Sequence, residues 1–388
     1  MGPLSGRAPA LQAGPRLGIF RRDFRYRLAV YRDCFQRKGK RSIMAEGILL
    51  GGLTDVVGIG NAIVDVLAHA EEEFLIRHGL NKGTMTLIDA ERATSLYAAM
   101  GSGVEVSGGS AGNTIAGIAS LGGKAGYIGK VGADELGRIF RHDIRANGVS
   151  FETPVATSTT PTARCLIFVT PDAQRTMNTY LGACIELTPE DIDPAVIAGA
   201  RVTYMEGYLW DPPAAKQAFL KAARIAHERG RKVSLSLSDP FCVDRHREEF
   251  RELVRDHVDI LFANEAEICS LWQTESFDAA LQATRGLCEV AALTRSAKGS
   301  LILAGEETHM VDATAVERVV DTTGAGDLYA AGFLYGYCRG LSPYDSGRIA
   351  SLAAAEVISH FGARPERPLA QLLAPLGIEA LQTETIQS

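Results

Sequence analysis

The sequence predicts an α/β protein of three layers, in which helices cover both faces of a mostly parallel central sheet. The first observation is that short apolar runs, typical of buried parallel strands, alternate with helical stretches from residue 55 onward. The second is that this alternation breaks at about residues 66–108 and 157–182, where strand-like runs crowd together. We expect these two segments to form a small β-rich lid on the main domain.

The strands of the central sheet are expected to follow one another along the chain, beginning with Val56–Asn61. The later ones are Ala125–Val131, Val202–Glu206, Val233–Leu237, Asp259–Ala263, Ala291–Thr294 and Val316–Val320. The lid is expected to hold an extra strand at Thr84–Ile88 and two strands, Ala163–Thr170 and Thr176–Tyr180, across a hairpin-like turn at Pro171–Gln174.

Helical stretches separate these strands. A helix at Asp134–Asn147 is amphipathic and is closed by Gly148, a residue that suits the left-handed end of a helix. The other expected helices are Ala111–Leu121, Ala214–Arg229, Arg245–Asp256, Ala266–Trp272, Phe277–Cys288 and Leu328–Tyr337.

Length and composition narrow the class of protein further. A chain of 388 residues, 46% hydrophobic, is long enough for one large domain and an accessory element. No apolar run reaches the roughly 18 residues that a membrane span requires. The seven cysteines are scattered and form no CxxC pair, which predicts reduced thiols in a cytoplasmic protein rather than disulfides or a zinc site.

Residues 1–43 differ in charge from the rest. They carry eleven Lys/Arg against Asp23 and Asp33, so that the remaining chain is acidic and poorly suited to nucleic acid. We expect this basic extension to lie outside the folded domain at 44–388. It reads as disordered or as upstream sequence before a start at Met44, with a transit peptide as the second interpretation.

The most informative motif is Asp321-Thr322-Thr323-Gly324-Ala325-Gly326-Asp327. It precedes an apolar helix, and its small residues allow backbone N–H groups to face an anion at the helix start. An acid beside such an anion site, Asp327, is what a kinase needs to deprotonate an attacking hydroxyl. The simpler interpretation is an acid that complements the helix dipole.

A second glycine-rich cluster lies upstream at Gly108-Gly109-Ser110-Ala111-Gly112-Asn113-Thr114. It fits neither a P-loop, since no Gly-Lys-Ser/Thr follows, nor a dinucleotide motif with a preceding strand. Ser110 and Asn113 are polar groups at a helix start. A binding loop and a structural turn are equally compatible with this pattern.

Polar residues also follow several predicted strands. Asn61 and Asp65 bracket the end of the first strand, where ligands of open α/β sheets bind. Asn264 and Glu267 follow a later strand and suit either a hydrated Mg²⁺ or an ordinary helix cap. The turn from Thr294 to Gly299 can line a nucleotide.

These motifs, in this order and spacing over about residues 53–366, resemble the ribokinase-like (PfkB) family of sugar and nucleoside kinases. The resemblance is nearest to the adenosine kinases, in stretches such as Gly60–Asp65, Glu206–Leu209, Leu235–Phe241 and Asp259–Glu265. It implies a ribokinase-like fold, ATP and Mg²⁺ as cofactors, and a nucleoside or sugar as substrate. It implies neither nucleic acid nor a membrane as partner, and it leaves monomer and homodimer open.

The resemblance also implies roles for individual residues. Asp327 would be the general base, the N–H groups of Gly324, Ala325 and Gly326 would stabilise the transferring phosphoryl, and Arg175 would reach the phosphates. The substrate would contact Asn61, Asp65, Gly108, Gly109, Ser110, Asn113 and Tyr208. The ATP side would comprise Asn264, Thr294, Arg295, Gly299 and Thr323. Asn264 and Glu267 would organise Mg²⁺ through water, and Asp321 would belong to a monovalent-cation (K⁺) site.

The activity expected is phosphorylation of the 5′-hydroxyl of adenosine to AMP in purine salvage. The alternative is a kinase of the same family acting on ribose, fructose or a related sugar. A binding protein that has lost transfer is disfavoured by the intact motifs, and action on nucleic acid through residues 1–43 is disfavoured by the acidic body.

Overall fold

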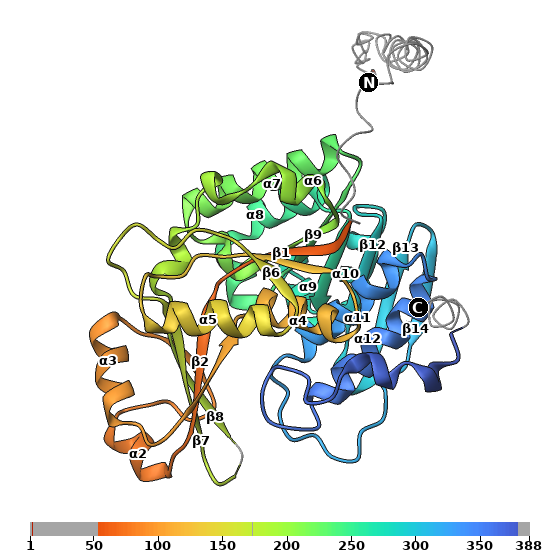
Figure 1. The fold of residues 1–388 in the computed structure, drawn as a ribbon. Helices are drawn as coiled ribbons and strands as arrows, with labels where there is room; N and C mark the ends of the chain where they lie inside the picture. The colour runs from red at the N-terminus through yellow and green to blue at the C-terminus, as the bar shows by residue number, and fades with distance from the viewer. Residues whose placement is uncertain (1, 3–52, 173, 379–388) are drawn as a thin grey trace. The chain divides into compact units, whose positions relative to one another are not determined.

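Two β-sheets organise the described part of the chain, which comprises residues 2, 53–172 and 174–378 of a computed structural model (Figure 1). Apart from Gly2, the basic extension at residues 1–43 lies outside the described residues. Strand formation starts at Thr54, and from Leu53 onward the chain forms a single unit.

The larger sheet has nine strands, and the smaller sheet has five. In spatial order, the large sheet consists of β14 (Glu307–Val311), β13 (Ser300–Ala304), β12 (Val290–Thr294), β11 (Ile260–Asn264), β10 (Lys232–Ser236), β9 (Ala200–Glu206), β1 (Thr54–Ile59), β5 (Ala125–Ile128) and β6 (Val149–Phe151). All its neighbours are parallel except β12–β13 and β13–β14. The mostly parallel central sheet predicted from the sequence is confirmed.

Helices cover both faces of this sheet (Figure 1). One face packs on α4 (Ser110–Ser120), α5 (Glu135–Ala146), α11 (Ala325–Cys338) and α12 (Pro343–Val357). The other packs on α6 (Pro194–Ala198), α7 (Pro213–Glu228), α8 (Pro240–His257), α9 (Glu265–Trp272) and α10 (Phe277–Thr284).

Alternation along the strands explains the three layers. On β1, the buried side chain of Val56 joins the first core and that of Val57 joins the second. Because successive strand residues point to opposite faces, a continuous apolar run feeds both cores at once.

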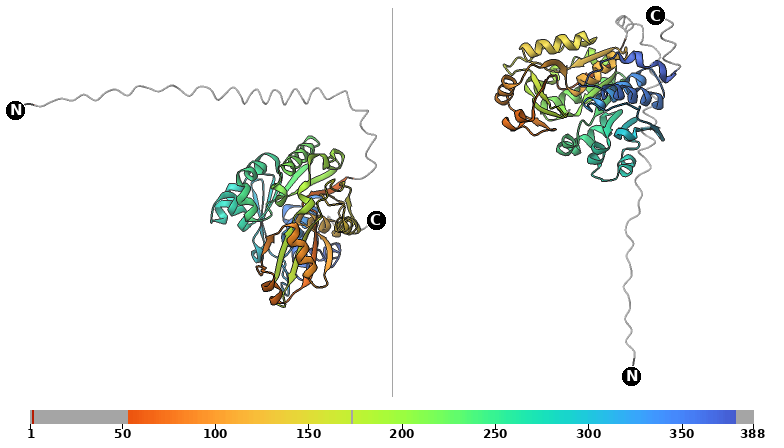
Figure 2. Two further views of the ribbon diagram at one scale, coloured as in Figure 1. Left: turned by 90° about the vertical axis from the view of Figure 1, so that its left-hand side faces the viewer. Right: turned by 90° about the horizontal axis from the view of Figure 1, so that it is seen from below.

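The smaller sheet contains β3 (Met85–Leu87), β8 (Arg175–Tyr180), β7 (Ala163–Val169), β2 (Ile63–His69) and β4 (Val104–Gly108). With helices α2 (Glu72–Arg77) and α3 (Ala90–Ala99), it projects from one side of the domain (Figure 2). Its strands fall largely within the two segments that interrupt the sequence pattern.

The way the helices begin separates two of them from most of the rest. Many start at a residue whose side chain accepts a backbone N–H, as at Asp89, Asp134, Asp193, Asp239, Asn264, Ser276 and Ser342. Helices α4 and α11 start instead at Gly109 (φ 83°) and Gly324 (φ 80°), without a capping side chain. Left-handed backbone at both positions favours glycine, and glycine has no side chain with which to cap the first N–H groups.

Several expectations from the sequence are wrong in detail. Residues 316–320 form no strand: β14 is already the sheet edge, the Val319 side chain is 52% exposed, and the Val320 N–H donates to the carbonyl of Ile358. A strand does precede the glycine cluster, since β4 ends at Gly108. Helix α8 begins earlier than expected because Pro240 occupies its first turn, where a missing N–H costs nothing.

Asp65 also lies elsewhere than expected. It belongs neither to the end of β1 nor to a loop, but to strand β2 of the smaller sheet, where it pairs with Val106 of β4. The chain leaves β1 at Ile59 and enters β2 at Ile63, so Asn61 sits at the crossover between the two sheets.

Two further observations concern the chain's general class. Six of the seven cysteines lie in the described ranges, and all six are free thiols. Across residues 53–172 and 174–378, no helix combines the length and apolar character needed to cross a bilayer.

Candidate active site

Asp327 lies in the first turn of α11, three residues after the left-handed Gly324. A Cβ at 324 would lie 2.9 Å from the Cα of Ala363, whereas one at 326 would meet no atom within 4 Å. Glycine at 324 is therefore required by the backbone and its neighbour, but the protein itself does not require glycine at 326. The open space at 326 lies at the positive end of the helix dipole.

The start of α4 holds the Asp327 carboxylate. Ser110 Oγ donates to Oδ1 at 2.6 Å, and Asn113 Nδ2 donates to Oδ2 at 2.9 Å. Burial raises the pKa of Asp327 to about 6, although both hydrogen bonds and the charge of Arg364 favour the ionised form. The carboxylate is fixed in orientation and is mostly ionised at neutral pH.

Asp65 projects from β2 toward the glycine cluster. A Cβ at Gly108 would lie 2.3 Å from Asp65 Oδ2, and a Cβ at Gly109 would lie 2.2 Å from the carbonyl oxygen of Asn61. Both glycines are thus needed for close packing. No hydrogen bond joins the Asp65 carboxylate to any group in the residues that the structure describes. Burial raises its pKa to about 7, Arg364 and Arg175 oppose this, and Asp327 adds to it.

Asn61 contacts a carboxylate that the sequence reasoning assigned no role. Asn61 Nδ2 donates to Oε1 of Glu206 at 2.9 Å, and the Ala111 N–H donates to Oε2 at 2.8 Å. Glu206 ends β9, is 1% exposed, and has its pKa raised to about 7 by burial. It ties the crossover between the sheets to the start of α4. A lone acid ending an apolar strand was the signal available in the sequence.

The Asp321 carboxylate joins α11's leading segment to the smaller sheet. Oδ1 accepts from the N–H and Oγ1 of Thr323, and Oδ2 accepts from the Gly362 N–H at 3.1 Å. Arg175, the first residue of β8, places Nη2 2.6 Å from Oδ2. The guanidinium therefore already supplies the positive charge here. This donor set does not fit an additional monovalent cation.

Asn264 and Glu267 form the helix cap that was the simpler interpretation. Asn264 Oδ1 accepts from the Glu267 N–H at 2.9 Å, and Glu267 Oε2 accepts from the Asn264 N–H at 2.9 Å. Burial raises the pKa of Glu267 to about 7, with Asp239 and Asp327 adding to the effect. No group of three or more metal-binding side chains occurs among the described residues. The exposed amide and the local negative charge fit Mg²⁺ that arrives with a nucleotide and keeps its waters.

The remaining predicted nucleotide residues lie beside this cap. Thr294 ends β12 directly opposite Asn264 of β11. Arg295 Nη2 lies 3.2 Å from Glu265 Oε1. The backbone N–H of Arg295 donates to the carbonyl of Gly299 and closes a tight turn. Tyr208 lies in the short 3₁₀ turn Gly207–Trp210 that follows β9, and its hydroxyl donates to the carbonyl of Ser238.

Electrostatics link these groups into one site. The charge of Asp327 contributes to raising the pKa of Asp65, Glu206 and Glu267. These three acids come from β2, β9 and α9, so chain segments far apart in sequence converge on the start of α11. Thr323 and Arg175 both contact the carboxylate of Asp321, which lies just before α11.

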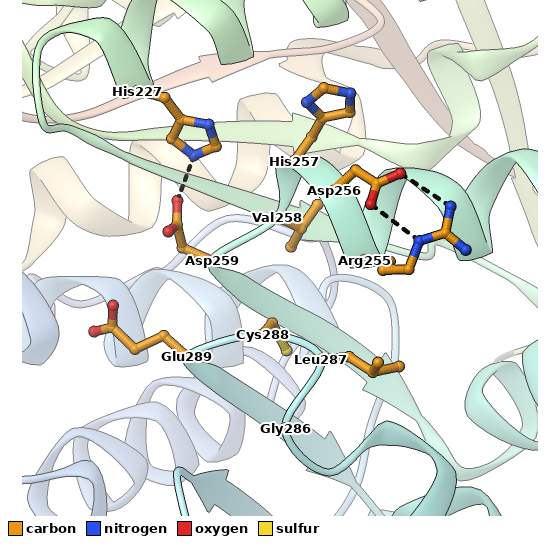
Figure 3. A pocket seen from close by; sticks show the side chains of 10 residues that line it. All are labelled: His227, Arg255, Asp256, His257, Val258, Asp259, Gly286, Leu287, Cys288 and Glu289. Atoms are coloured by element: carbon orange, nitrogen blue, oxygen red, sulfur yellow. Dashed lines mark hydrogen bonds and ion pairs between the residues drawn. The ribbon is translucent and has the colours of Figure 1, made fainter. Parts of the chain in front are cut away.

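A separate hollow of about 420 Å³ lies at the opposite edge of the large sheet (Figure 3). It is formed where β11 and β12 begin, whereas Asn264 and Thr294 are where these strands end. Its polar side chains have local partners: His227 Nε2 lies 2.9 Å from Asp259 Oδ2, and Arg255 pairs with Asp256. The hollow has none of the predicted site residues.

Sequence reasoning also missed Arg364, whose signal was weak because it follows the last helix in an irregular segment. Its Nη2 donates to the carbonyl of Ser107 at 2.8 Å, immediately before the glycine cluster. Its charge opposes the raised pKa of both Asp65 and Asp327.

Fold and site together define a small-molecule kinase of the α/β class. Residues 83–369 match the pfkB family of carbohydrate kinases, and the chain belongs to that family. The ribokinase-like fold expected from the sequence is confirmed.

Three relatives illustrate the range of the similarity. A protein of Rhizobium etli CFN 42 described as a probable sugar kinase is 54% identical, with a TM-score of 0.79 over 84% of this chain and 99% of its own. The adenosine kinase of Sinorhizobium meliloti is also 54% identical, with a TM-score of 0.78 over 84% and 100%. The adenosine kinase of Saccharomyces cerevisiae is 25% identical over 307 residues, 74% of this chain and 89% of that protein.

Proposed function

We propose that this kinase uses ATP to phosphorylate the 5′-hydroxyl of adenosine, forming AMP for purine salvage. The observation that carries the proposal is the position of Asp327, held by Ser110 and Asn113 at the open, glycine-rich start of α11. The similarity to the S. meliloti adenosine kinase over nearly all of that chain supports the substrate.

In this proposal Asp327 accepts the proton of the attacking hydroxyl. Phosphoryl transfer has a loose transition state, so the proton leaves late and a base with a pKa of about 6 is sufficient. The two hydrogen bonds to its oxygens fix the carboxylate, leaving positioning as its main contribution.

Asp65 is proposed to bind the ribose hydroxyls. Its carboxylate accepts nothing within the described chain, and two adjacent hydroxyls are suitable donors for its two oxygens. Gly108 and Gly109 allow the backbone to approach Asp65 and Asn61 closely, and the Asn113 amide holds Asp327. We propose that these residues border the sugar. Asn61 is proposed to act through Glu206, since its side chain is only 2% exposed.

The phosphates of ATP are proposed to lie against the N–H groups of Gly324, Ala325 and Gly326, with Thr323 and Arg175 beside them. Bound Mg²⁺ would neutralise phosphate charge. Asn264 and Glu267 are placed to orient its water ligands, while Thr294, Arg295 and Gly299 line the nucleotide.

The smaller sheet is proposed to act as the lid, over about residues 66–108 and 157–182. Strand pairing puts Asp65 and Arg175 on the same face of this sheet, through Cys165 and Val169 of β7. Apart from Thr179, the neighbouring residues on that face are apolar, with buried Ile167 packed against Ile63, Leu67 and Met177. An apolar surface beside a hydroxyl-binding acid favours a nucleoside, whose base needs such a wall, and Tyr208 is proposed as its aromatic complement.

We further propose a cytoplasmic enzyme, supported by the six free thiols, that acts as a monomer or homodimer. The kinase domain would correspond to residues 44–388. The alternative substrate is a free sugar such as ribose or fructose, which the R. etli relative favours.

The test is ADP release with Mg-ATP across adenosine, other nucleosides, ribose and fructose. Turnover at micromolar adenosine supports the proposal. Turnover only with a free sugar would move the function to the alternative and remove the base wall, while retaining the Asp327 chemistry.

A variant at Gly326 tests the proposed phosphate site separately. Because a Cβ at 326 meets no protein atom within 4 Å, Gly326→Ala should fold normally and gain up to about 1 kcal/mol from helix propensity. We expect its kcat to fall at least about tenfold, because the methyl group occupies the space proposed for phosphate oxygens. Unchanged kcat would place the phosphates elsewhere.

A further inference from the structure

Arg364 contacts the residue that precedes the glycine cluster of the candidate active site. It follows Gly362 and Ala363 in the segment after α12, and its Nη2 donates to the carbonyl (2.8 Å) and to Oγ (3.1 Å) of Ser107. Ser107 is fully buried and is the residue before Gly108. The same guanidinium nitrogen would lie 3.5 Å from a Cβ at Gly112, in the first turn of α4. Arg364 thus lies against β4 and the first turn of α4, the two elements that meet at the glycine cluster.

The contact extends to a third element. The Ser107 N–H and Oγ both donate to Oδ2 of Asp143 in α5, at 2.8 and 2.5 Å. The serine hydroxyl therefore accepts from Arg364 and donates to Asp143, which fixes the direction of its single proton. The last segment of the domain, β4 and α5 are joined at one buried point.

The other nitrogens of this guanidinium are not used in the same way. Nε and Nη1 of Arg364 are buried and have no hydrogen-bond partner within the described ranges. A buried cation with unpaired donors is unfavourable unless nearby negative charge compensates it. The charged and titratable groups that face it are Asp65 from β2, Tyr127 from β5, Asp143 from α5 and Asp327 from α11.

Two of these groups are the carboxylates of the proposed reaction. Burial raises the pKa of Asp65 to about 7 and that of Asp327 to about 6, and the charge of Asp327 adds to the rise at Asp65. Arg364 favours ionisation of both, and Arg175 adds to its effect only on Asp65. A common cation allows two neighbouring acids to carry charge together.

We propose that Arg364 is a positioning residue: it fixes the Ser107–Gly108–Gly109 turn and supplies the positive charge that keeps Asp65 and Asp327 ionised together. This inference rests on the proposed function of that site. Because its nitrogens are shielded from solvent, Arg364 acts through its neighbours and does not touch the substrate.

The test compares Arg364→Gln, Arg364→Lys and the control Arg367→Gln, an exposed arginine three residues later. In Arg364→Gln we expect the acid limb of the kcat/KM profile, near pH 6 in wild type, to move up by about one pH unit. The loss relative to wild type should be about twofold at pH 7, approach tenfold near pH 5 and disappear toward pH 9. Arg364→Lys should keep the limb near the wild-type position but raise KM, because an ammonium cannot reproduce the planar fork. The control should match wild type.

A role confined to stability predicts otherwise: a lower melting temperature with an unmoved acid limb in both variants would overturn the proposal. If Arg364→Gln fails to fold, Arg364→Lys is compared with Ser107→Ala. Both variants should raise KM and leave the acid limb at its wild-type position, and an unchanged KM in both would overturn the proposal.

A readout independent of substrate separates this inference from the proposed function. Titration of [γ-¹³C]Asp-labelled protein, assigned with Asp327→Asn and Asp65→Asn, reports both carboxyl groups directly. Upward movement of both in Arg364→Gln supports the proposal even if adenosine is not the substrate. Titrations that coincide with wild type would reject it even if adenosine is.

Discussion

Replacing Asp327 by asparagine should make the free protein more stable while removing its activity. Burial raises the pKa of Asp327 from 3.8 to about 6, so ionising it in the folded state is unfavourable by roughly 3 kcal/mol, at 1.36 kcal/mol per unit. The side chain keeps partial contact with solvent, and we therefore expect about 1–2 kcal/mol of stabilisation above pH 7. That corresponds to about 2–4 °C in melting temperature.

The sign follows from linkage. A carboxyl group with a raised folded-state pKa contributes full stability below its unfolded pKa, and this is lost as the pH rises through about 6. Asparagine does not ionise, so the variant's advantage should be absent near pH 4 and complete near pH 7. The local hydrogen bonds permit the change, because Asn113 Oδ1 has no partner among the described residues and the Asn113 amide can flip to accept from the new amide.

The assay is urea or thermal unfolding of wild type and Asp327→Asn from pH 4.5 to 8.5, with kcat measured on the same samples. Asp278→Asn is the control, an exposed acid in the first turn of α10 that should change stability by only a few tenths of a kcal/mol. A stability difference that is negative, or equal at pH 5 and pH 8, would refute the assigned burial and charge of Asp327. Retained kcat would refute its role as base.

Three further predictions concern the same site. For wild type, kcat/KM should fall as the pH drops through about 6, by about tenfold at pH 5, because the base must be ionised; a profile flat to pH 5 would contradict this. Gly108→Ala puts a Cβ 2.3 Å from Asp65 Oδ2 and should raise KM on the order of tenfold, whereas Gly101→Ala, with nothing within 4 Å, should behave as wild type in the same kinetics. Exchanging Na⁺ for K⁺ should change wild-type kcat by less than about twofold, because Arg175 already supplies the positive charge beside Asp321. In Arg175→Met this charge is removed, so K⁺ should raise the melting temperature of the variant. An equal response of both proteins to K⁺ would reject the fit of Arg175 to this position.

Much of the fold could be read from local patterns. The run Ile260–Ala263 is apolar because both faces of a parallel strand are buried, so pattern and structure agree closely there. Val316–Val320 also contains β-branched residues but has no strand beside it, and β structure depends on a pairing partner. The lid strands were located but incompletely described, because β2 and β4 pair with residues more than 35 positions away in the chain.

The site divides in the same way. Asp327, Gly324 and the capping pair Asn264–Glu267 were recognisable because their roles depend on residues within a few positions in the chain. Glu206 and Arg364 were not, since their contacts span 95 and 257 residues. The choice between a cation and Arg175 beside Asp321 was equally invisible, because Arg175 lies 146 residues earlier on another sheet.

By itself, the sequence determined the parallel α/β architecture, the two glycine-led helix starts and the identity of the acid at the second of them. These are local properties, set by side-chain size, backbone freedom and hydrophobic alternation. Only the tertiary structure decided which charges meet. It placed Asp65 on the smaller sheet, buried Glu206 and Arg364 behind the glycine cluster and raised the pKa values of the acids around Asp327, because burial and charge–charge distance are properties of the packed chain.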